Sequence, residues 1–473
     1  MEDLYNETGS PSLKPNHQCF VFCVDAWARS NHREAAKNAE RILKKMESLF
    51  LDSVDDTDRM NNFAYNILTS FWAKRGERGS SERIQGTIHR LTEMSDQTNN
   101  EGLAPDKFTY TSLMLALVNE KIPGNLEKCG AVLDRMEDLA ERTGKKALMP
   151  DEMAYATIMN GYSHEGNAQM IESLIRRMKC KGIPCTDIAY NILLNAIVKI
   201  KAHDVAERAE DVLKRMAQEL ADGNSGCRPS IVSYITCIKA LSRSHDPNKI
   251  KRALKLFETI AGRFKSGDES FRPSERVLGS VLDVVAKSNE AHKVSMCLGL
   301  IDRMKKEYGV TPNRVAYNIV LSACAHHIDP SENEQLRREV LKTAVSTFQL
   351  LSKDGSLGGP DSTSYRSLLL VVDRFIIDEG ERMASMEDLW NKCCKDGQVN
   401  QWVLQALFKV SGPHFWRLVD KDRRSAGIVK VQDLPPEWSR NTGTNVGSMM
   451  GSHHRRQKRR RGAPRQREQR NWR

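Results

Sequence analysis

The sequence lacks the residue patterns on which many catalytic folds depend. It has no glycine-rich phosphate loop of the Walker type, and no His-x-Glu followed by a Cys-x-x-Cys pair, which excludes a P-loop nucleotidase and a zinc deaminase. No paired-aspartate segment of the kind found in metal-dependent nucleases stands near the C-terminal end. None of the eleven cysteines are spaced as Cys-x-x-Cys, so neither a zinc site nor a redox motif is indicated. We therefore expect no catalytic residue, no metal and no cofactor.

Long apolar runs are also missing, because none approaches the ~18 residues that a membrane span needs. The first residues include Glu2, Asp3 and Glu7, which suit neither a secretory signal nor an acid-poor transit peptide. From the sequence we therefore expect no membrane partner, and we see no transit peptide in the chain as given.

Positive charge is concentrated at the C-terminal end. The chain has a formal charge of +11, and residues 453–473 hold ten Arg or Lys against the single acid Glu468. This segment carries +9, which leaves +2 for the other 452 residues. Its composition predicts a basic disordered tail, which acts as a nonspecific phosphate-binding arm, an import signal or a solvated end. The remainder is nearly neutral, so its bulk charge does not favour nucleic acid.

Apolar anchor residues recur at nearly regular steps. Each anchor opens the same helical pattern, and the successive steps are 45, 45, 45, 35, 44, 44, 39 and 48 residues. The anchors are Phe20, Tyr65, Tyr110, Tyr155, Tyr190, Tyr234, Leu278, Tyr317 and Tyr365. Self-similarity at a period of about 20–50 residues is typical of stacked repeat proteins. The spacing therefore predicts a repeat protein with a long surface rather than a globular enzyme.

The shortest repeat, residues 152–186, shows the pattern most clearly. An apolar stripe at i, i+3, i+4 and i+7 comes first, formed by Tyr155, Ile158, Met159 and Tyr162. After a polar break, a second stripe with the same spacing follows, formed by Ile171, Leu174, Ile175 and Met178. The two stripes predict a hairpin of two amphipathic helices, and both recur in all nine repeats with isolated lapses.

A proline followed by Asp, Ser or Asn separates most repeats. Proline ends one helix, and the polar residue after it can cap the next. These connectors lie at residues 104–106, 149–151, 228–230, 272–274, 311–313 and 359–361. Capping alone would explain the residue types, but the position is unusually uniform.

One hairpin cannot bury its apolar faces alone, so neighbouring hairpins must supply the rest of the core. We therefore expect an all-α fold, a right-handed α-solenoid of about nine helix-turn-helix repeats. The expected organisation is an N-terminal lead at residues 1–16, the repeat array at 17–400, a capping helix and loop at 401–452, and the basic tail at 453–473.

Several repeats resemble a known family. Ala-Tyr-Asn-Ile-Leu-Leu at 189–194, Ala-Tyr-Asn-Ile-Val-Leu at 316–321, Ala-Tyr-Ala-Thr-Ile-Met at 154–159 and Phe-Thr-Tyr-Thr-Ser-Leu at 108–113 resemble the first helix of pentatricopeptide repeats of the P class. Met-Lys-x-x-Gly-Ile-Pro at 178–184 resembles the close of the second helix. The resemblance covers about four-fifths of the chain, although most repeats are longer than the family norm. We expect the extra residues to tilt neighbouring repeats.

The resemblance implies binding of single-stranded organellar RNA at one base per repeat. In the family, the residue two before the anchor sandwiches the base. Those positions hold Phe63, Phe108, Met153, Ile188, Val232 and Val315 in six repeats. Six apolar side chains away from the core stripe suit base stacking, with shallow packing between repeats as the structural alternative.

The family reads the base edge with the residue after the anchor and the last residue of the repeat. Asn66 with Asp106, and Asn318 with Asp361, resemble the uracil combination; Thr111 with Asp151 resembles the guanine one, and Asn191 with Ser230 the cytosine one. The remaining pairs, among them Gly279 with Asn313 and Arg366 with Asn400, match no combination. The resemblance implies the footprint x-U-G-x-C-x-x-U-x, written 5′ to 3′.

The expected function is sequence-selective binding of single-stranded RNA, by a non-catalytic factor in organellar RNA processing, stability or translation. The resemblance places such a factor in a mitochondrion or plastid, where other proteins of RNA metabolism are expected partners. The alternative is a protein-binding scaffold of the tetratricopeptide kind, which uses similar hairpins. Its Trp…Leu-Gly…Tyr signature does not occur here.

Overall fold

The structure is a computed structural model of the chain that describes residues 15–30, 32–51, 60–200, 202–327, 334–419 and 430–442. Within these ranges the chain forms α-helices and short 3-10 turns and no β-strand. None of the described helices is both long and apolar enough to cross a membrane. The expected basic tail at 453–473 lies outside the described residues, as do residues 1–14 of the expected lead.

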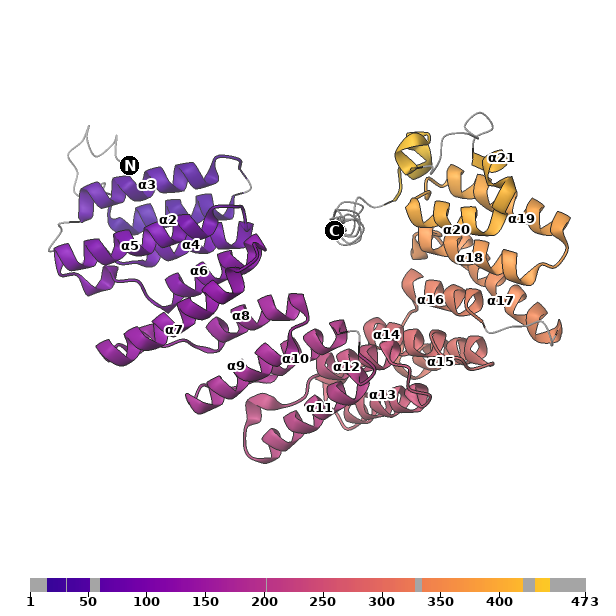
Figure 1. Ribbon diagram of the computed structural model, residues 1–473, viewed down its shortest axis with the longest axis horizontal. Coiled ribbons are helices and arrows are strands. Elements are labelled where there is room, and N and C mark those ends of the chain that lie inside the picture. Colours follow the sequence, from indigo (N-terminus) through magenta and orange to yellow (C-terminus); the bar gives the residue numbers. More distant parts are fainter. Residues whose placement is uncertain are drawn as a thin grey trace, which may run out of the picture. The chain divides into compact units, whose positions relative to one another are not determined.

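The chain divides into two compact lobes, residues Met1–Asp246 and Pro247–Arg473. Figure 1 shows successive helical hairpins within each lobe. The first lobe contains α2 (His17–Arg29), α3 (Ala35–Phe50), α4 (Phe63–Arg75), α5 (Ser80–Thr98), α6 (Lys107–Glu120), α7 (Asn125–Thr143), α8 (Glu152–Glu165), α9 (Ala168–Cys180), α10 (Asp187–Lys199), α11 (Val205–Ala221) and α12 (Ile231–Arg243). The second lobe contains α13 (Lys249–Lys265), α14 (Glu275–Ala286), α15 (Lys293–Tyr308), α16 (Arg314–Ala325), α17 (Glu334–Lys353), α18 (Ser362–Phe375), α19 (Glu379–Lys395), α20 (Gln401–Ser411) and α21 (Phe415–Val419).

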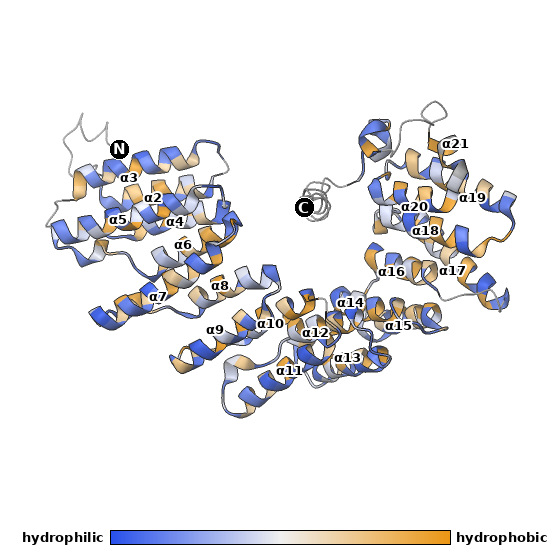
Figure 2. Cartoon of the chain, viewed as in Figure 1, coloured by the Kyte–Doolittle hydropathy of each residue, from blue (hydrophilic) through white to orange (hydrophobic). Residues whose placement is uncertain are grey.

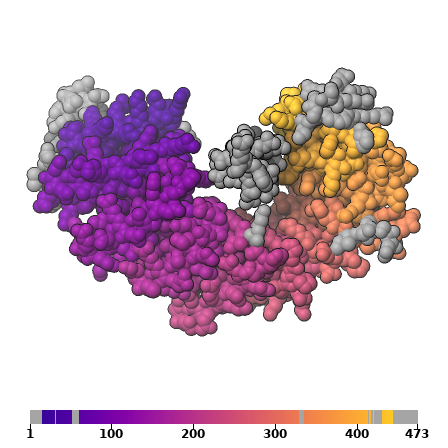
Figure 3. Space-filling view, viewed as in Figure 1, coloured from indigo at the N-terminus to yellow at the C-terminus, as the bar shows by residue number. Residues whose placement is uncertain are grey.

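Each anchor begins a helix that packs against the corresponding helix of the next repeat. We call these the first helices: α2, α4, α6, α8, α10 and α12 in the first lobe, and α14, α16 and α18 in the second. Within each lobe, successive first helices lie in contact, and each also contacts a second helix. Consecutive repeats therefore lie side by side, and the colour changes steadily along each lobe in Figure 3. This arrangement confirms the predicted all-α solenoid of helical hairpins.

The helices hold together by burying the predicted stripes. Polar and apolar residues alternate around the helices in Figure 2, and eight of the nine anchors are buried. Tyr155 and Tyr365 are completely enclosed, whereas Tyr317 is only partly buried. Burying a large apolar side chain stabilises a fold by about 1.5–3 kcal/mol. Because each stripe meets both its own hairpin and a neighbour, the core runs through the repeats of a lobe.

The extra residues of the longer repeats lie at the end of the second helix and in a short turn after it. The second helix α9 of the shortest repeat has 13 residues, whereas α5 and α7 have 19 each. The 3-10 turns η2 (Glu101–Leu103), η3 (Lys146–Leu148), η4 (Ser225–Cys227), η5 (Glu269–Phe271) and η6 (Gly355–Leu357) precede the proline connectors. Leu103, Cys227 and Phe271 of these turns are buried. The insertions thus extend the core, and the next first helix still begins at its polar cap.

The C-terminal ends of the first helices are linked between repeats. Asn119 Nδ2 donates to the Ala73 carbonyl at 2.8 Å, and Lys199 Nζ donates to the Ser163 carbonyl at 2.9 Å. In the same way, Arg374 Nη1 donates to the carbonyl of Ala325, the last residue of α16, at 3.2 Å and to that of His327 just after it at 2.8 Å. The last carbonyls of a helix lack intrahelical donors and carry partial negative charge, so amide and cationic donors stabilise them.

Two buried carboxylates link repeats further inside the first lobe. Glu137 on α7 accepts a hydrogen bond from the hydroxyl of the anchor Tyr155 at 2.6 Å and from Arg177 Nε on α9 at 3.0 Å. Two repeats earlier, Glu47 on α3 accepts hydrogen bonds from Tyr65 on α4 and Arg90 on α5 in the same arrangement. Burial alone would raise the pKa of Glu137, but the hydrogen bonds from Arg177 and Tyr155 outweigh it and hold that pKa below its usual 4.5.

We predict that Glu137→Gln lowers the stability of the first lobe by about 1–3 kcal/mol at neutral pH. The substitution leaves the charged Arg177 beside a neutral amide in a mostly buried contact, which destabilises the fold. Because Arg177 is partly exposed to water, the loss of stability stays within this range. Denaturant unfolding monitored by circular dichroism measures it. The control is Glu172→Gln, which removes an exposed ion pair to Arg215 and is expected to cost at most about 0.5 kcal/mol.

The pH dependence follows from the sign of the Glu137 shift. A carboxyl with a lowered folded pKa stabilises the fold above its unfolded pKa, and this stability is lost as pH falls through the folded value. The difference between wild type and Glu137→Gln should therefore be full at neutral pH and shrink as pH falls below 4.5. A difference that stays constant across this range would contradict the role given to the carboxylate.

Candidate RNA-binding surface

Exposed apolar side chains recur at the starts of the first helices, five in the first lobe and one in the second, and we call this set the row. Each stands two residues before the anchor, so it leaves the buried stripe and points away from the core. Phe63, Phe108, Met153, Ile188, Val232 and Val315 are all exposed, at 46–61% of their surface. The structural alternative of packing between repeats would require these side chains to be covered, and they are not. The equivalent positions of two further repeats hold Arg276 and Thr363, which are also exposed.

Three of the four expected base-reading pairs are brought into contact by the fold. Asn66 Nδ2 lies 3.1 Å from Asp106 Oδ2, and Asn318 Nδ2 donates to Asp361 Oδ1 at 3.0 Å. Asn191 Nδ2 lies 3.4 Å from Ser230 Oγ, a weaker contact than its hydrogen bond to Asp187 Oδ2 at 3.1 Å. In each pair, the residue after one anchor therefore meets the residue that starts the next first helix.

A hydroxyl group fixes the orientation of each of these amides. Thr109 Oγ1 donates to Asn66 Oδ1 at 2.7 Å, Ser233 Oγ to Asn191 Oδ1 at 2.7 Å, and Ser364 Oγ to Asn318 Oδ1 at 2.6 Å. Because the amide oxygen is occupied, the NH₂ group is directed to the carboxylate or hydroxyl of the pair. Our sequence reasoning missed these hydroxyls, although all three stand three residues after a helix cap, where a capping box places them.

The fourth pair does not meet. Thr111 Oγ1 donates to the carbonyl of Lys107 at 2.6 Å in its own helix, and Asp151 accepts from the backbone N–H of Ala154 at 3.1 Å. Lys107 Nζ lies 3.1 Å from Asp151 Oδ2. A lysine ammonium thus occupies the carboxylate that would serve with Thr111, because Lys107 stands at the first position of the preceding first helix and is long enough to reach it.

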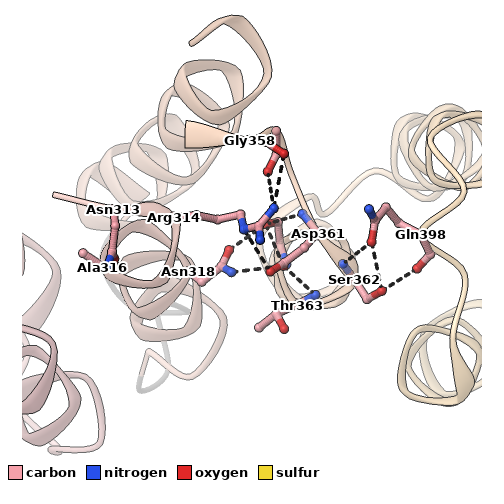
Figure 4. A network of polar contacts seen from close by, with 11 residues as sticks. Asn313, Arg314, Ala316, Asn318, Gly358, Asp361, Ser362, Thr363 and Gln398 are labelled. Carbon is pink, nitrogen blue, oxygen red and sulfur yellow. Dashed lines mark hydrogen bonds and ion pairs between the residues drawn. The ribbon is translucent and has the colours of Figure 1, made fainter. Parts of the chain in front are cut away.

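The carboxylate of Asp361 both caps a helix and faces the pair. Its Oδ1 accepts from the N–H groups of Thr363 at 2.9 Å and Ser364 at 3.0 Å, and so caps the start of α18. Arg314 Nε lies 3.4 Å from Oδ2, and Arg314 Nη1 donates to the Gly358 carbonyl at 3.2 Å. Figure 4 shows Arg314, Asn318 and Asp361 converging from α16 and the start of α18. Asn318 is 7% exposed, which makes it less accessible than the half-buried Asn66 and Asn191.

One oxygen of the capping carboxylates retains acceptor capacity. Asp106 Oδ1 accepts from the N–H groups of Phe108 and Thr109, both at 3.0 Å, whereas Oδ2 accepts from Asn66 alone among the described residues. A carboxylate oxygen can accept two hydrogen bonds. The site therefore offers an oriented amide donor and a free carboxylate lone pair beside an exposed apolar side chain.

The second helices present a different surface. Their exposed charges pair between consecutive repeats, as in Arg177 with Asp134 at 2.6 Å and Arg303 with Glu258 at 2.6 Å. No group of three or more His, Cys, Asp or Glu side chains in the described ranges is arranged to hold a metal ion. The described features that suit a ligand are thus concentrated at the starts of the first helices.

Two sequence families match parts of the chain. The PPR repeat family matches residues 150–199, and the pentatricopeptide repeat domain matches residues 284–327. A mitochondrial 15S rRNA processing factor, CCM1, of Meyerozyma guilliermondii is 23% identical over 255 residues, which are 49% of this chain and 38% of the relative. The crystal structure of the maize pentatricopeptide repeat protein PPR10 in complex with an 18-nucleotide psaJ RNA element is similar at a TM-score of 0.54 and 15% identity, over 86% of this chain and 50% of the PPR10 chain. The chain thus spans half or less of the length of these relatives.

The two roles of Asp361 can be separated by substitution. We predict that Asp361→Ala destabilises the second lobe by about 1 kcal/mol, because it removes the side-chain cap of α18. Asp361→Asn keeps a capping oxygen and should stay within about 0.3 kcal/mol of wild type. Denaturant unfolding compares the two variants. Equal losses would show that the carboxylate charge, rather than the cap, stabilises the start of α18.

Proposed function

We propose that this chain, a pentatricopeptide repeat protein, binds single-stranded RNA along the starts of its first helices and acts as a non-catalytic factor in mitochondrial RNA metabolism. The observation that carries the proposal is the coincidence of two patterns at one place. Exposed apolar side chains and oriented polar pairs occur together in three repeats, those of Asn66, Asn191 and Asn318, at the starts of the first helices. The exposed apolar side chains lie outside the core, and the helix caps do not need the amides that they contact.

The apolar row suits bases that are not stacked on one another. Adjacent packed helices lie about 8–10 Å apart, whereas stacked bases are ~3.4 Å apart. A strand bound at one base per repeat must therefore be unstacked, and a side chain has to occupy the space between consecutive bases. Phe63 and Phe108 on α4 and α6 are placed to do this, and stacking of a base on an aromatic side chain contributes ~1–3 kcal/mol.

The polar pairs match base edges by donor and acceptor. Uracil presents two carbonyl oxygens with an N–H between them, so the amide of Asn66 can donate to a carbonyl while Asp106 Oδ2 accepts the N–H. Cytosine presents two acceptors and an amino group, which suits the amide of Asn191 with the hydroxyl of Ser230. Mismatched bases would leave partly buried polar groups unpaired, which costs about 1–3 kcal/mol each.

The contacts of two pairs add a condition for base reading. Arg314 has to leave Asp361, and Lys107 has to leave Asp151, before a base can use the carboxylate. The side chains of Arg314 and Lys107 are 40% and 34% exposed. Their ion pairs therefore contribute little to stability and exchange readily. Once released, each cation lies beside the RNA backbone and can neutralise a phosphate. We thus propose base reading at all four pairs: Asn66 with Asp106, Thr111 with Asp151, Asn191 with Ser230, and Asn318 with Asp361.

The comparisons bear on the compartment and the process. Of the two organelles implied by the resemblance, the mitochondrial relative supports the mitochondrion, and its name as an rRNA processing factor supports a role in RNA processing. The repeat surface supplies binding and ordering of a strand, and we assign it no catalytic residue. In this role the chain would position or protect an RNA segment for other proteins of RNA metabolism.

We predict different effects from a polar and an apolar substitution. The probe is the RNA 5′-AUGACAAUG-3′, which follows the footprint, with variants that replace one nucleotide at a time. Asn66→Ala should lower the preference for uracil over cytosine at the second nucleotide by about tenfold, with a small loss of affinity. Phe108→Ala should weaken binding of all variants by about tenfold without changing base preference. Fluorescence anisotropy at fixed salt measures both.

Two controls sharpen this test. Phe22→Ala removes another aromatic side chain that is 70% exposed on α2 but outside the row, and it should not affect binding. A chain shortened at about residue 450 removes the basic tail, which supplies nonspecific affinity only. If the shortened chain lost all RNA binding, or if Asn66→Ala weakened every sequence equally, base reading by the repeats would be wrong. A protein-binding scaffold would then be the better reading of the hairpins.

A further inference from the structure

Helix α20 begins like a first helix, and the described residues after it include only the short helix α21. Asn400 caps it by accepting from the N–H of Val403 at 3.0 Å, as Asn313 accepts from Ala316 at 3.1 Å at the start of α16. Leu404, four residues after the cap, is buried at the anchor position. Helix α20 also packs on α18 as α18 packs on α16. Helix α20 thus follows the order of the first helices within its lobe, at the start of the segment 401–452 that the sequence predicts as a capping helix and loop.

The strongest consequence is the position of Trp402. It stands two residues before Leu404, where earlier repeats carry Phe63, Phe108 and Val315, and it is 61% exposed. Tryptophan is enriched at interfaces because its indole offers a large apolar surface with one polar group. At this position in the row, Trp402 would stack on a base of the bound strand as the other members of the row do.

The connector before α20 is held against the start of α18. Ser362 Oγ donates to the Gln398 carbonyl at 2.7 Å, and the Ser362 N–H donates to Gln398 Oε1 at 3.2 Å, as Figure 4 shows beside Asp361. One repeat earlier, Arg314 makes the equivalent contact to the Gly358 carbonyl before Asp361. Asn400 thus stands relative to α18 as Asp361 stands relative to α16. In that earlier repeat, the residue after the anchor meets the cap directly.

The residue after the anchor in α18 is Arg366. Its side chain is half-buried and makes no hydrogen bond or ion pair with any residue that the structure describes. Asn400 Oδ1 accepts the capping hydrogen bond, and the Asn400 NH₂ adds two donors to those of the Arg366 guanidinium. The pair of Arg366 and Asn400 is therefore rich in donors, whereas the pair of Asn66 and Asp106 presents a donor and a carboxylate acceptor.

We propose that Arg366, Asn400 and Trp402 form a binding site for a guanine base at the 3′ end of the bound strand. This proposal rests on the proposed function, since it assumes that the row holds RNA. Guanine presents O6 and N7 as adjacent acceptors, which the parallel N–H groups of a guanidinium match in a bidentate contact. Adenine places a donor beside its N7, and uracil places a donor between its two acceptors, so both oppose a site rich in donors.

The stacking partner agrees with a purine. On the other side of this site, the row holds Thr363, whose short side chain offers little area for stacking. Trp402 must therefore provide most of it, and a two-ring base covers an indole better than a one-ring base. Cytosine also has two adjacent acceptors, O2 and N3, but it gives up part of this contact. The site should therefore bind guanine more tightly than cytosine, and both of these bases more tightly than adenine or uracil.

The test uses the full chain and the RNA 5′-AUGACAAUN-3′, with N as guanine, cytosine, adenine, uracil or 7-deazaguanine. Wild type should bind the guanine RNA about tenfold more tightly than the adenine or uracil RNA. The 7-deazaguanine RNA, which lacks the N7 acceptor, should lose most of this advantage. Arg366→Ala and Arg366→Lys should both abolish the preference, and the lysine variant should keep the overall affinity because it keeps the charge.

Matched variants separate this site from general effects. Arg41→Ala removes an exposed positive charge from α3 in the other lobe, and it should leave the guanine preference intact. Trp402→Ala should weaken binding of the purine RNAs by about tenfold and of the cytosine and uracil RNAs by less. Equal binding of the five RNAs by wild type, or a preference that survives Arg366→Ala, would overturn the proposed site. If uracil at the eighth nucleotide is still preferred in that case, base reading by the other repeats stands. If no RNA binds selectively at any position, the proposed function fails with it.

Discussion

The contact between a helix cap and the preceding repeat is the interaction on which the rest of the structure depends. One side chain, such as Asp361, satisfies the free N–H groups at the start of its own helix and accepts a hydrogen bond from Asn318 of the repeat before it. An uncapped helix start leaves backbone donors without partners, so the cap stabilises the helix that it begins. Because the same side chain also binds the neighbour, it fixes how one first helix stands against the next. The cap contact, together with the hydroxyl of Ser364, orients the amide that would contact a base.

The spacing of the candidate site is kept even though the repeats differ in length. Extra residues are absorbed at the ends of second helices and in 3-10 turns that bury side chains such as Leu103 and Phe271. The first helices after these turns still begin at a polar cap with an exposed side chain two residues later. The variation therefore falls on the side of the second helices, where exposed ion pairs tolerate change. The starts of the first helices remain comparable from repeat to repeat within each lobe.

The fold was largely predictable from the sequence, whereas the contacts of the site were predictable only in part. Stripes at helical spacing and proline connectors indicate hairpins directly, because burial and backbone geometry decide both. The exposure of Phe108 and Met153 followed from the same helical period. The hydroxyl of Thr109 and the lysine on Asp151 were missed, because they depend on which side chains from different repeats reach one another. The position of Trp402 was missed for a different reason: no second stripe follows α20, so its helix was interpreted as a cap rather than compared with the first helices.

An exchange of base preference tests the central claim most directly. Ser230 stands beside Asn191 where Asp106 stands beside Asn66, and aspartate caps a helix as well as serine does. The measurement is the relative affinity of wild type and Ser230→Asp for RNAs that differ only at the fifth nucleotide of 5′-AUGACAAUG-3′. Our account predicts that wild type prefers cytosine at this nucleotide and that Ser230→Asp prefers uracil, with unchanged preferences elsewhere. A variant that folds and binds RNA but keeps the wild-type preference, or has none at the fifth nucleotide, would contradict it.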